Sequence, residues 1–151
     1  DSTELSEKIV VSLALQKSES IDLKTNDEIL ITADTLVVFN GEILGKPVNY
    51  DHAFAMLSTL SGKTHEVYTG ICIRSLEKKV VNYAKTEVTF KKITSEEIDY
   101  YITNFKPYDK AGAYGIQEWL GFHKIEKITG SYFNVVGLPC VLISEMLQSF
   151  I

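Results

Sequence analysis

The sequence predicts a single domain of mixed α/β fold over residues 1–151. Segments typical of helices and strands follow each other in the order helix, strand, helix, strands, helix, strand, helix. Hydrophobic residues make up 45% of the chain and charged residues 23%, a balance typical of a domain that can bury a core. No internal repeat, low-complexity tract or linker divides the chain, so we expect no second domain.

Apolar periodicity defines the first elements. Residues 3–19 carry apolar side chains three and four positions apart, which predicts an amphipathic helix. Residues 29–39 are nearly all apolar and rich in β-branched side chains, which predicts a buried strand. The tight-turn signal Asn40-Gly41 leads into a short strand at 42–44. The inner stripe expected for the helix is formed by Ile9, Val10, Leu13 and Ala14.

A second helix and a pair of strands follow. Asn49 or Asp51 can accept hydrogen bonds from the first turn of a helix that runs to about Leu60. Residues 64–76 and 79–93 have the composition of two long strands separated by a short polar turn. This arrangement predicts an antiparallel pair.

The last third of the chain is expected to mix short elements with a long loop. Thr94 and Glu97 have the spacing of a capping box, which begins a helix. Pro139 suits the first turn of another helix because its missing N–H is not needed there. The elements expected in order are a helix from Thr94 to about Thr103, a loop with three glycines at 105–121, a strand at 122–128 and a helix from Pro139 to about Gln148.

The charge balance restricts the classes of partner. The chain has 15 basic and 20 acidic residues, a formal net charge of -5, whereas nucleic-acid-binding domains usually carry a basic excess. No segment approaches the roughly 18 consecutive apolar residues of a membrane span. We therefore expect neither nucleic acid nor a membrane as partner. Cys72 and Cys140 have no metal-binding spacing and are expected to be buried thiols of a cytoplasmic protein.

Four segments carry residues suited to a small anionic ligand, and each also has a simpler interpretation. Asp34-Thr35 interrupts an apolar strand, where a carboxylate is costly unless it is paired or used, or else it caps a turn. Lys46, between a glycine and a proline, could meet a phosphate or lie on the surface. The small residues within 109–117 permit close approach of a ligand, or form an ordinary turn. Thr69 could bind a ligand or simply favour a strand.

Taken together and in this order, the segments closely resemble the Maf family of house-cleaning nucleotide pyrophosphatases. The matching runs are LALQKSE at 13–19, ADTLVVFNGEILGKP at 33–47, LSGKTHEVYTG at 60–70, DKAGAYGIQ at 109–117 and ITGSYFNVVGLP at 128–139. The resemblance implies a fold like that of inosine triphosphate pyrophosphatase, with the site in a cleft between two lobes. The family's typical first strand and phosphate-binding loop precede these runs, so we expect the amino-terminal strand and loop to be missing from this chain.

The resemblance also implies a reaction. KAGAYGIQ and GSYFNVVGLP look like the subfamily that acts on dTTP and UTP, cleaving between the α- and β-phosphates to give the monophosphate and pyrophosphate. A divalent cation, Mg²⁺ or Mn²⁺, would be the cofactor, and a homodimer is expected. A non-catalytic nucleotide-binding regulator of cell division is the alternative.

The same resemblance assigns roles to individual residues. Asp34 matches the catalytic aspartate, expected to act as a general base, to contact the metal, or both. Thr35 and Gln117 match positions linked to the choice of base. Trp119 could stack on a base, but it is expected in the core or in a dimer contact. The lysines expected to bind phosphate are Lys17, Lys46 and Lys110, and the other residues expected to contact substrate are Thr69, Asp109 and Tyr114.

Overall fold

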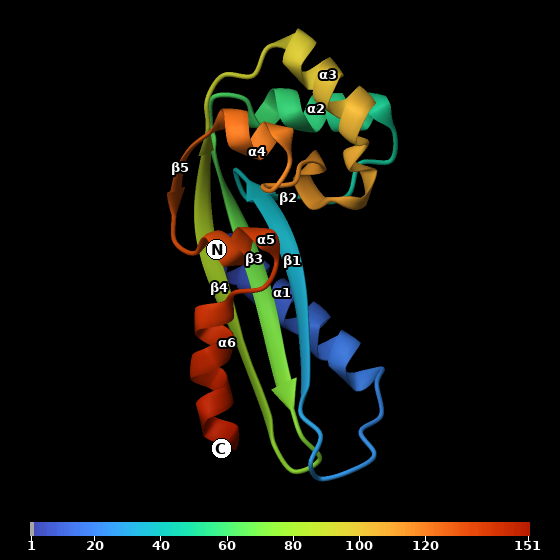
Figure 1. Cartoon of the computed structure of the whole chain (residues 1–151), viewed down its shortest axis with the longest axis vertical. Helices are drawn as coiled ribbons and strands as arrows, with labels where there is room; N and C mark the ends of the chain where they lie inside the picture. Colours follow the sequence, from blue (N-terminus) through green and yellow to red (C-terminus); the bar gives the residue numbers. More distant parts are fainter. Residues whose placement is uncertain (1) are drawn as a thin grey trace.

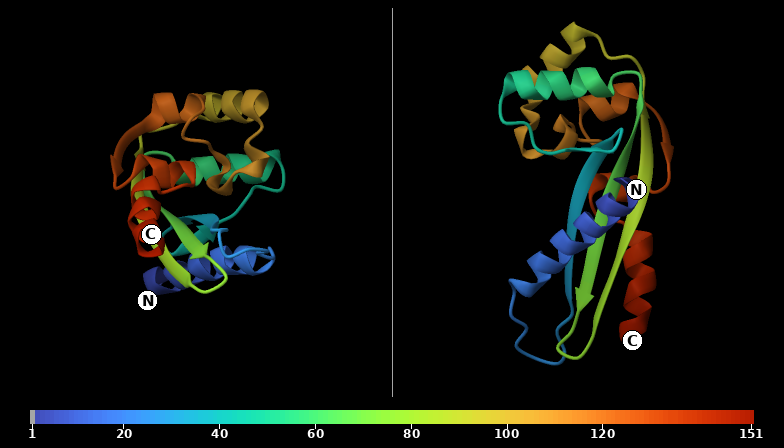
Figure 2. Two further views of the ribbon diagram at one scale, coloured as in Figure 1. Left: turned by 60° about the horizontal axis from the view of Figure 1, so that its bottom comes forward. Right: turned by 180° about the vertical axis from the view of Figure 1, so that it is seen from behind.

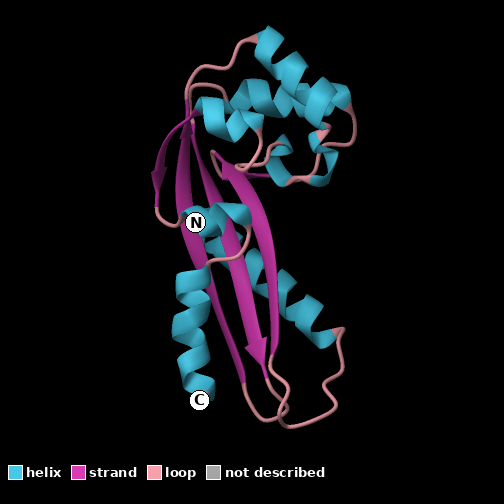
Figure 3. Ribbon diagram, viewed as in Figure 1, coloured by secondary structure: helices cyan, strands magenta, loops and turns pink. Residues whose placement is uncertain are grey.

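The computed structural model describes residues 2–151, with side chains from residue 4 onward, as a mixed α/β fold around one five-stranded sheet (Figures 1 and 3). The helices are α1 (Ser2–Glu19), α2 (Tyr50–Leu60), α3 (Ser95–Phe105), α4 (Trp119–Lys124), α5 (Tyr132–Val136) and α6 (Cys140–Leu147), with short 3-10 turns η1 (Pro107–Asp109), η2 (Ala111–Ala113) and η3 (Gln148–Phe150). The strands are β1 (Leu30–Phe39), β2 (Glu42–Leu44), β3 (Thr64–Arg74), β4 (Lys79–Phe90) and β5 (Ile125–Thr129).

The sheet is antiparallel, in the order β2-β1-β3-β4-β5. The expected pairing of β3 with β4 is confirmed, and it runs from Thr64 opposite Thr89 to Arg74 opposite Lys79. Strand β1 pairs with β3 along nearly its whole length but with β2 only from residue 37 to residue 39. Within the described chain, residues 30–36 of β1 therefore have a neighbouring strand on one side only.

The helices divide into three groups around the long strands (Figures 1 and 2). Helix α1 crosses one face of the sheet, as the view from behind shows (Figure 2, right). Helices α5 and α6 lie against the opposite face (Figure 1). Helices α2, α3 and α4 gather with η1 and η2 at one end of the sheet and form a helical lobe (Figure 3). Among residues 2–151, no helix is both long and apolar enough to cross a membrane.

Helix α1 packs unusually close to β3. A Cβ added at Gly70 would lie 2.2 Å from the Val10 carbonyl oxygen, so the helix backbone rests directly on this glycine. The Thr32 hydroxyl donates to the Ala14 carbonyl oxygen at 2.7 Å and fixes α1 against β1 as well. The buried positions of α1 are accordingly Ser6, Val10, Ala14 and Ser18.

Several local predictions are wrong, each for an identifiable reason. The inner stripe of α1 was expected to include Ile9 and Leu13, but both are only partly buried because the close approach selects smaller side chains. Strand β1, expected to be buried, is only partly so, since one edge of its residues 30–36 has no strand beside it in the described part of the chain. Cys140 is exposed at the start of α6, whereas Cys72 is buried as expected.

The carboxyl-terminal third contains two helices that the sequence did not reveal. Residues 119–124 form α4, so the strand expected at 122–128 begins only at Ile125. Residues 132–136 form α5, which the Ser131 side chain caps by accepting from the Asn134 N–H. Both helices are shorter than two turns, too short for apolar periodicity to appear. By contrast, the Thr94–Glu97 capping box and the Asn49 cap are present as predicted.

A buried histidine lies in the core beneath the helical lobe. The His65 side chain is 1% exposed, and its Nε2 lies 2.6 Å from the Tyr114 hydroxyl. Its ring centroid lies 5.1 Å from that of Phe90. Burial lowers the pKa of His65 to about 4, because the surrounding apolar groups disfavour the charged imidazolium. The folded protein therefore holds this histidine neutral.

Replacing Gly70 with alanine should destabilise the protein by about 1–3 kcal/mol, because its Cβ would overlap the α1 backbone. Thermal unfolding followed by circular dichroism measures the effect. Gly45→Ala is the control, since a Cβ there has nothing within 4 Å. Equal melting temperatures for the two variants would contradict the close packing of α1 on β3.

His65 should make the free energy of unfolding depend on pH. Its stabilising contribution is complete above the unfolded pKa of about 6.5 and is lost as the pH falls through the folded pKa of about 4. The loss amounts to roughly 3 kcal/mol. Urea unfolding at pH 7 and pH 4 should therefore show a smaller pH dependence for His65→Gln than for the parent. An identical pH dependence in both proteins would show that His65 is not buried neutral.

Candidate functional site

A cavity of about 440 Å³ lies beside the edge of β1 where residues 30–36 have no neighbouring strand within residues 2–151. Its size falls within the range of small-molecule sites. Its walls come from α1, β1, the loop after β2, the segment 109–118, and α5 with the glycine that follows it. The predicted site residues that line it are Lys17, Asp34, Thr35, Lys46, Asp109, Lys110, Tyr114 and Gln117. The structure thus brings together residues from four separate parts of the chain.

Asp34 is held on β1 by two partners. Its Oδ1 lies 3.0 Å from the Lys17 ammonium, and the Thr35 backbone N–H donates to the same oxygen at 3.1 Å. Lys17 also donates to the Ala33 carbonyl oxygen at 3.2 Å. Because Lys17 lies in the last turn of α1, the packing of that helix on the sheet determines where its ammonium meets Asp34. The carboxylate is partly buried, with 27% of its side chain exposed.

Lys46 is brought to the cavity by the loop after β2, which contacts the glycine-rich segment 109–118. The Gly112 N–H donates to the Gly45 carbonyl oxygen at 3.1 Å and links the two loops. Gly112 has φ 70°, a left-handed conformation that favours glycine, and a Cβ there would meet Val37 at 3.0 Å. The small residues predicted to allow a ligand to approach thus also allow this loop to pack on β1.

Lys110 lies within a cluster of opposite charges. Its ammonium is 2.9 Å from Glu118 Oε1 and 3.1 Å from Asp109 Oδ1. The bond to Glu118 is the main cause that raises the pKa of Lys110, whereas the bond from Lys110 lowers the pKa of Asp109. Glu118 is also the acceptor for the Tyr101 hydroxyl at 2.5 Å. The raised pKa of Lys110 and the lowered pKa of Asp109 keep these two groups charged around neutral pH.

Thr69 does not line the cavity but lies directly behind Thr35. The two hydroxyl oxygens are 2.9 Å apart, and the Thr69 hydroxyl donates to the Asn134 carbonyl oxygen at 3.2 Å. Asn134 is fully buried, and its side-chain amide donates to the Val67 carbonyl oxygen and to the Thr86 hydroxyl. This buried network anchors α5, so that residues 135–137 form one wall of the cavity.

Tyr114 and Gln117 contribute in different ways. Tyr114 is 6% exposed and holds its hydroxyl against His65, so it forms part of the cavity floor. Burial raises the pKa of its hydroxyl, which stays protonated. Gln117 is exposed at the cavity, and its amide has no hydrogen-bond partner within residues 2–151. That amide is available to a ligand. Trp119 packs against the core, in agreement with one of its two expected places.

Sequence reasoning overlooked two residues of the site. Glu118 follows the recognised DKAGAYGIQ run directly and lines the cavity beside Lys110. Asn134, an amide inside the apolar run YFNVVGL, organises the cavity wall from behind. The signal in both cases is a polar residue among apolar ones, which requires a partner when buried.

The charges around the cavity suit a metal-bound polyphosphate. Three lysines and three carboxylates line it, so the protein alone offers a triphosphate no net positive charge. Residues 2–151 contain no group of three His, Cys, Asp or Glu side chains that could hold a metal by themselves. Mg²⁺ is commonly bound by one or two carboxylates together with phosphate oxygens and water. Asp34, a partly buried carboxylate at the cavity, has the chemistry of a protein ligand to such an ion.

Comparison with known proteins gives a consistent result. The family described as Maf-like protein matches residues 1–150. A dTTP/UTP pyrophosphatase of Bacillus cereus (strain G9842) is 51% identical over 142 residues, which are 94% of this chain and 74% of the relative. The dTTP/UTP pyrophosphatases of Porphyromonas gingivalis (strain ATCC BAA-308 / W83) and Christiangramia forsetii are 46% and 51% identical, over 95% of this chain and 74% and 76% of their own lengths.

The match covers every segment that contributes to the cavity, from the last turn of α1 to the glycine after α5. Together with the mixed α/β architecture, it shows that this chain belongs to the Maf family.

Proposed function

We propose that this chain is a nucleoside triphosphate pyrophosphatase that hydrolyses dTTP and UTP to the monophosphate and pyrophosphate. The observation that carries the proposal is the meeting of one partly buried carboxylate, Asp34, with three lysines in a cavity of suitable size. Relatives that are 46–55% identical bear the name dTTP/UTP pyrophosphatase, which supports the same substrates here.

Asp34 is proposed as the general base. Lys17 and the Thr35 N–H both engage its Oδ1, which fixes the carboxylate and leaves Oδ2 to accept the proton of the attacking water. The oxygen of that water forms a bond to the α-phosphorus while its proton passes to Asp34. The bond between the α-phosphorus and the oxygen bridging to the β-phosphate breaks, and pyrophosphate leaves.

The three lysines are proposed to bind the phosphates and to stabilise the charge that develops on them. Lys17, Lys46 and Lys110 approach from three different elements, so they can contact different phosphate groups. Fixed cations of this kind lower the barrier because they need no reorganisation during the reaction. When bound, a Mg²⁺ or Mn²⁺ ion would neutralise phosphate charge, and Asp34 would be one of the groups that hold it.

Base selection is proposed to involve Gln117 and Thr35. The free Gln117 amide can both donate and accept, which matches the edge of a thymine or uracil ring. Thr35 presents its hydroxyl at the cavity with Thr69 behind it. Asp109 and Tyr114 are proposed to contact the substrate from the same segment. A homodimer and a cytoplasmic location, both implied by the family resemblance, stay predictions.

Asp34→Asn should lower kcat for dTTP and UTP by on the order of 10²–10⁴, because the amide cannot accept the proton of the attacking water. Pyrophosphate release with Mg²⁺ or Mn²⁺ across a panel of nucleoside triphosphates measures this. Asp22→Asn, at an exposed position outside the cavity, is the control and should retain the parental rate. Nucleotide binding by a parent that releases no pyrophosphate would support the regulatory alternative instead.

Lys46→Met should reduce kcat/KM by roughly 30- to 1,000-fold, the equivalent of about 2–4 kcal/mol of transition-state stabilisation. The same pyrophosphate assay provides the measurement. Lys24→Met removes an exposed lysine that does not line the cavity and should have little effect. If both variants lose activity equally, general charge rather than a phosphate contact at Lys46 explains the loss.

A further inference from the structure

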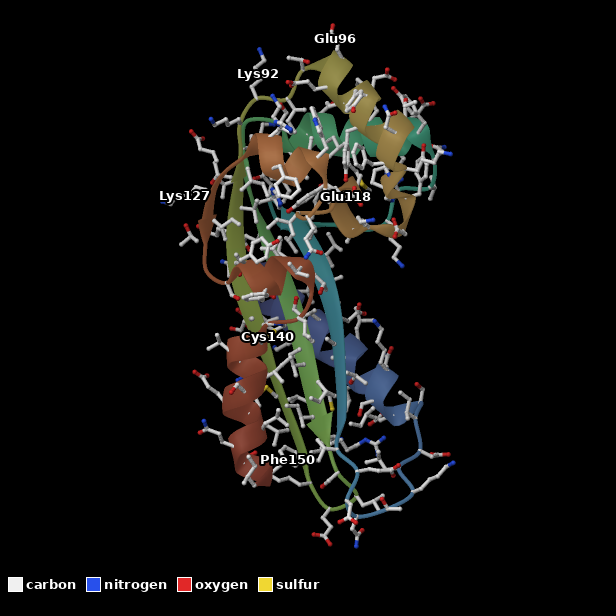
Figure 4. The ribbon with its side chains drawn as sticks, in the orientation of Figure 1. Lys92, Glu96, Glu118, Lys127, Cys140 and Phe150 are labelled. Carbon is white, nitrogen blue, oxygen red and sulfur yellow. The ribbon has the colours of Figure 1, made fainter. Side chains whose placement is uncertain are left out.

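We propose that Glu118 is a positioning residue that holds the Lys110 ammonium in the place from which it acts on the phosphates, at the expense of some attraction for the substrate. The inference rests on the proposed function, because Lys110 is there assigned to phosphate. Glu118 lies where the short helices of the helical lobe meet the sheet (Figure 4). It lines the same cavity as Asp34 and the three lysines.

Glu118 uses both carboxylate oxygens. Oε1 lies 2.9 Å from the Lys110 ammonium, and Oε2 accepts from the Tyr101 hydroxyl at 2.5 Å. The Tyr101 hydroxyl oxygen in turn accepts from the Gly115 N–H at 3.0 Å. Tyr101 is fully buried in α3. The carboxylate is therefore fixed from the core side, and only its other oxygen faces the lysine.

The backbone around this ion pair leaves room for it. A Cβ added at Gly115 would lie 2.9 Å from Lys110 Cε and 3.1 Å from Glu118 Cδ, so both side chains rest against the bare glycine backbone. About two thirds of the Lys110 side chain is covered. Asp109, the other partner of the ammonium, has 75% of its side chain exposed to solvent. Glu118 is thus the partner that gives Lys110 one defined position.

A carboxylate beside a phosphate-binding lysine has two opposing effects. It immobilises the long side chain, so less conformational freedom is lost when the transition state forms. It also cancels part of the lysine charge and repels an anionic triphosphate, which weakens binding of the ground state. Removing the charge while preserving the shape should therefore lower kcat and also lower KM. A mutation that merely reduced the folded fraction would lower kcat and leave KM unchanged.

The decisive comparison uses Glu118→Gln, which keeps the size of the side chain and loses its charge. Steady-state pyrophosphate release from dTTP should show kcat about tenfold lower and KM severalfold lower than in the parent. The chain offers a matched control in Glu66, which also bridges a lysine, Lys85 at 3.2 Å, and a tyrosine hydroxyl, Tyr68 at 2.5 Å. Glu66 does not line the cavity, so Glu66→Gln should retain both parental constants.

A double variant shows whether Glu118 acts through Lys110. If it does, Glu118→Gln lowers kcat when Lys110 is present. In a protein that already carries Lys110→Met, adding Glu118→Gln should lower kcat no further. The proposal is overturned if Glu118→Gln lowers kcat by the same factor in the Lys110→Met protein as in the parent. It is also overturned if Glu118→Gln leaves KM unchanged or raises it. A parent without pyrophosphatase activity would instead refute the proposed function, so the two failures are distinct.

Discussion

The contact on which the rest of the structure depends is the approach of the α1 backbone to β3 at Gly70. A side chain at that position would collide with the Val10 carbonyl oxygen, so only glycine permits the observed distance. The approach fixes the height of α1 above the sheet and thereby the position of its last turn. Lys17 lies in that turn, and its ammonium meets Asp34 on the neighbouring strand. A packing constraint in the core thus sets the distance between two charged groups of the site.

The cavity exists because several elements converge where residues 30–36 of β1 have, within the described chain, a neighbouring strand on one side only. Two supports hold its walls from behind. On one side, Thr69 and Asn134 form a buried hydrogen-bond network that carries α5. On the other, Tyr101 and Glu118 tie the glycine-rich segment to α3. The hydrogen bonds that these buried groups make also orient the residues that face the ligand.

Long helices and strands could be predicted from the sequence, whereas the shortest helices could not. The long strands β3 and β4 and the capped helices α2 and α3 were expected from alternation, turn signals and capping residues, which act within a few positions of each other. Helices α4 and α5 were missed because both are too short to show apolar periodicity, and α5 is held by the buried Asn134 network, whose partners lie far away in the sequence. The predicted inner face of α1 was partly wrong, because Ile9 and Leu13 were expected to be buried and are only partly buried. The sequence does not show how closely a helix approaches its sheet.

The sequence by itself determined the fold class, the family and the chemical types at the site, because motif order and residue type are carried directly in the chain. It identified Asp34, the three lysines and Gln117 as site residues but gave no distances between them. Only the tertiary structure decided that these residues share one cavity, that Thr69 lies behind Thr35, and that Glu118 is bonded to Lys110. The physical reason is that such contacts join residues far apart in sequence, and their geometry is set by how the helices pack on the sheet.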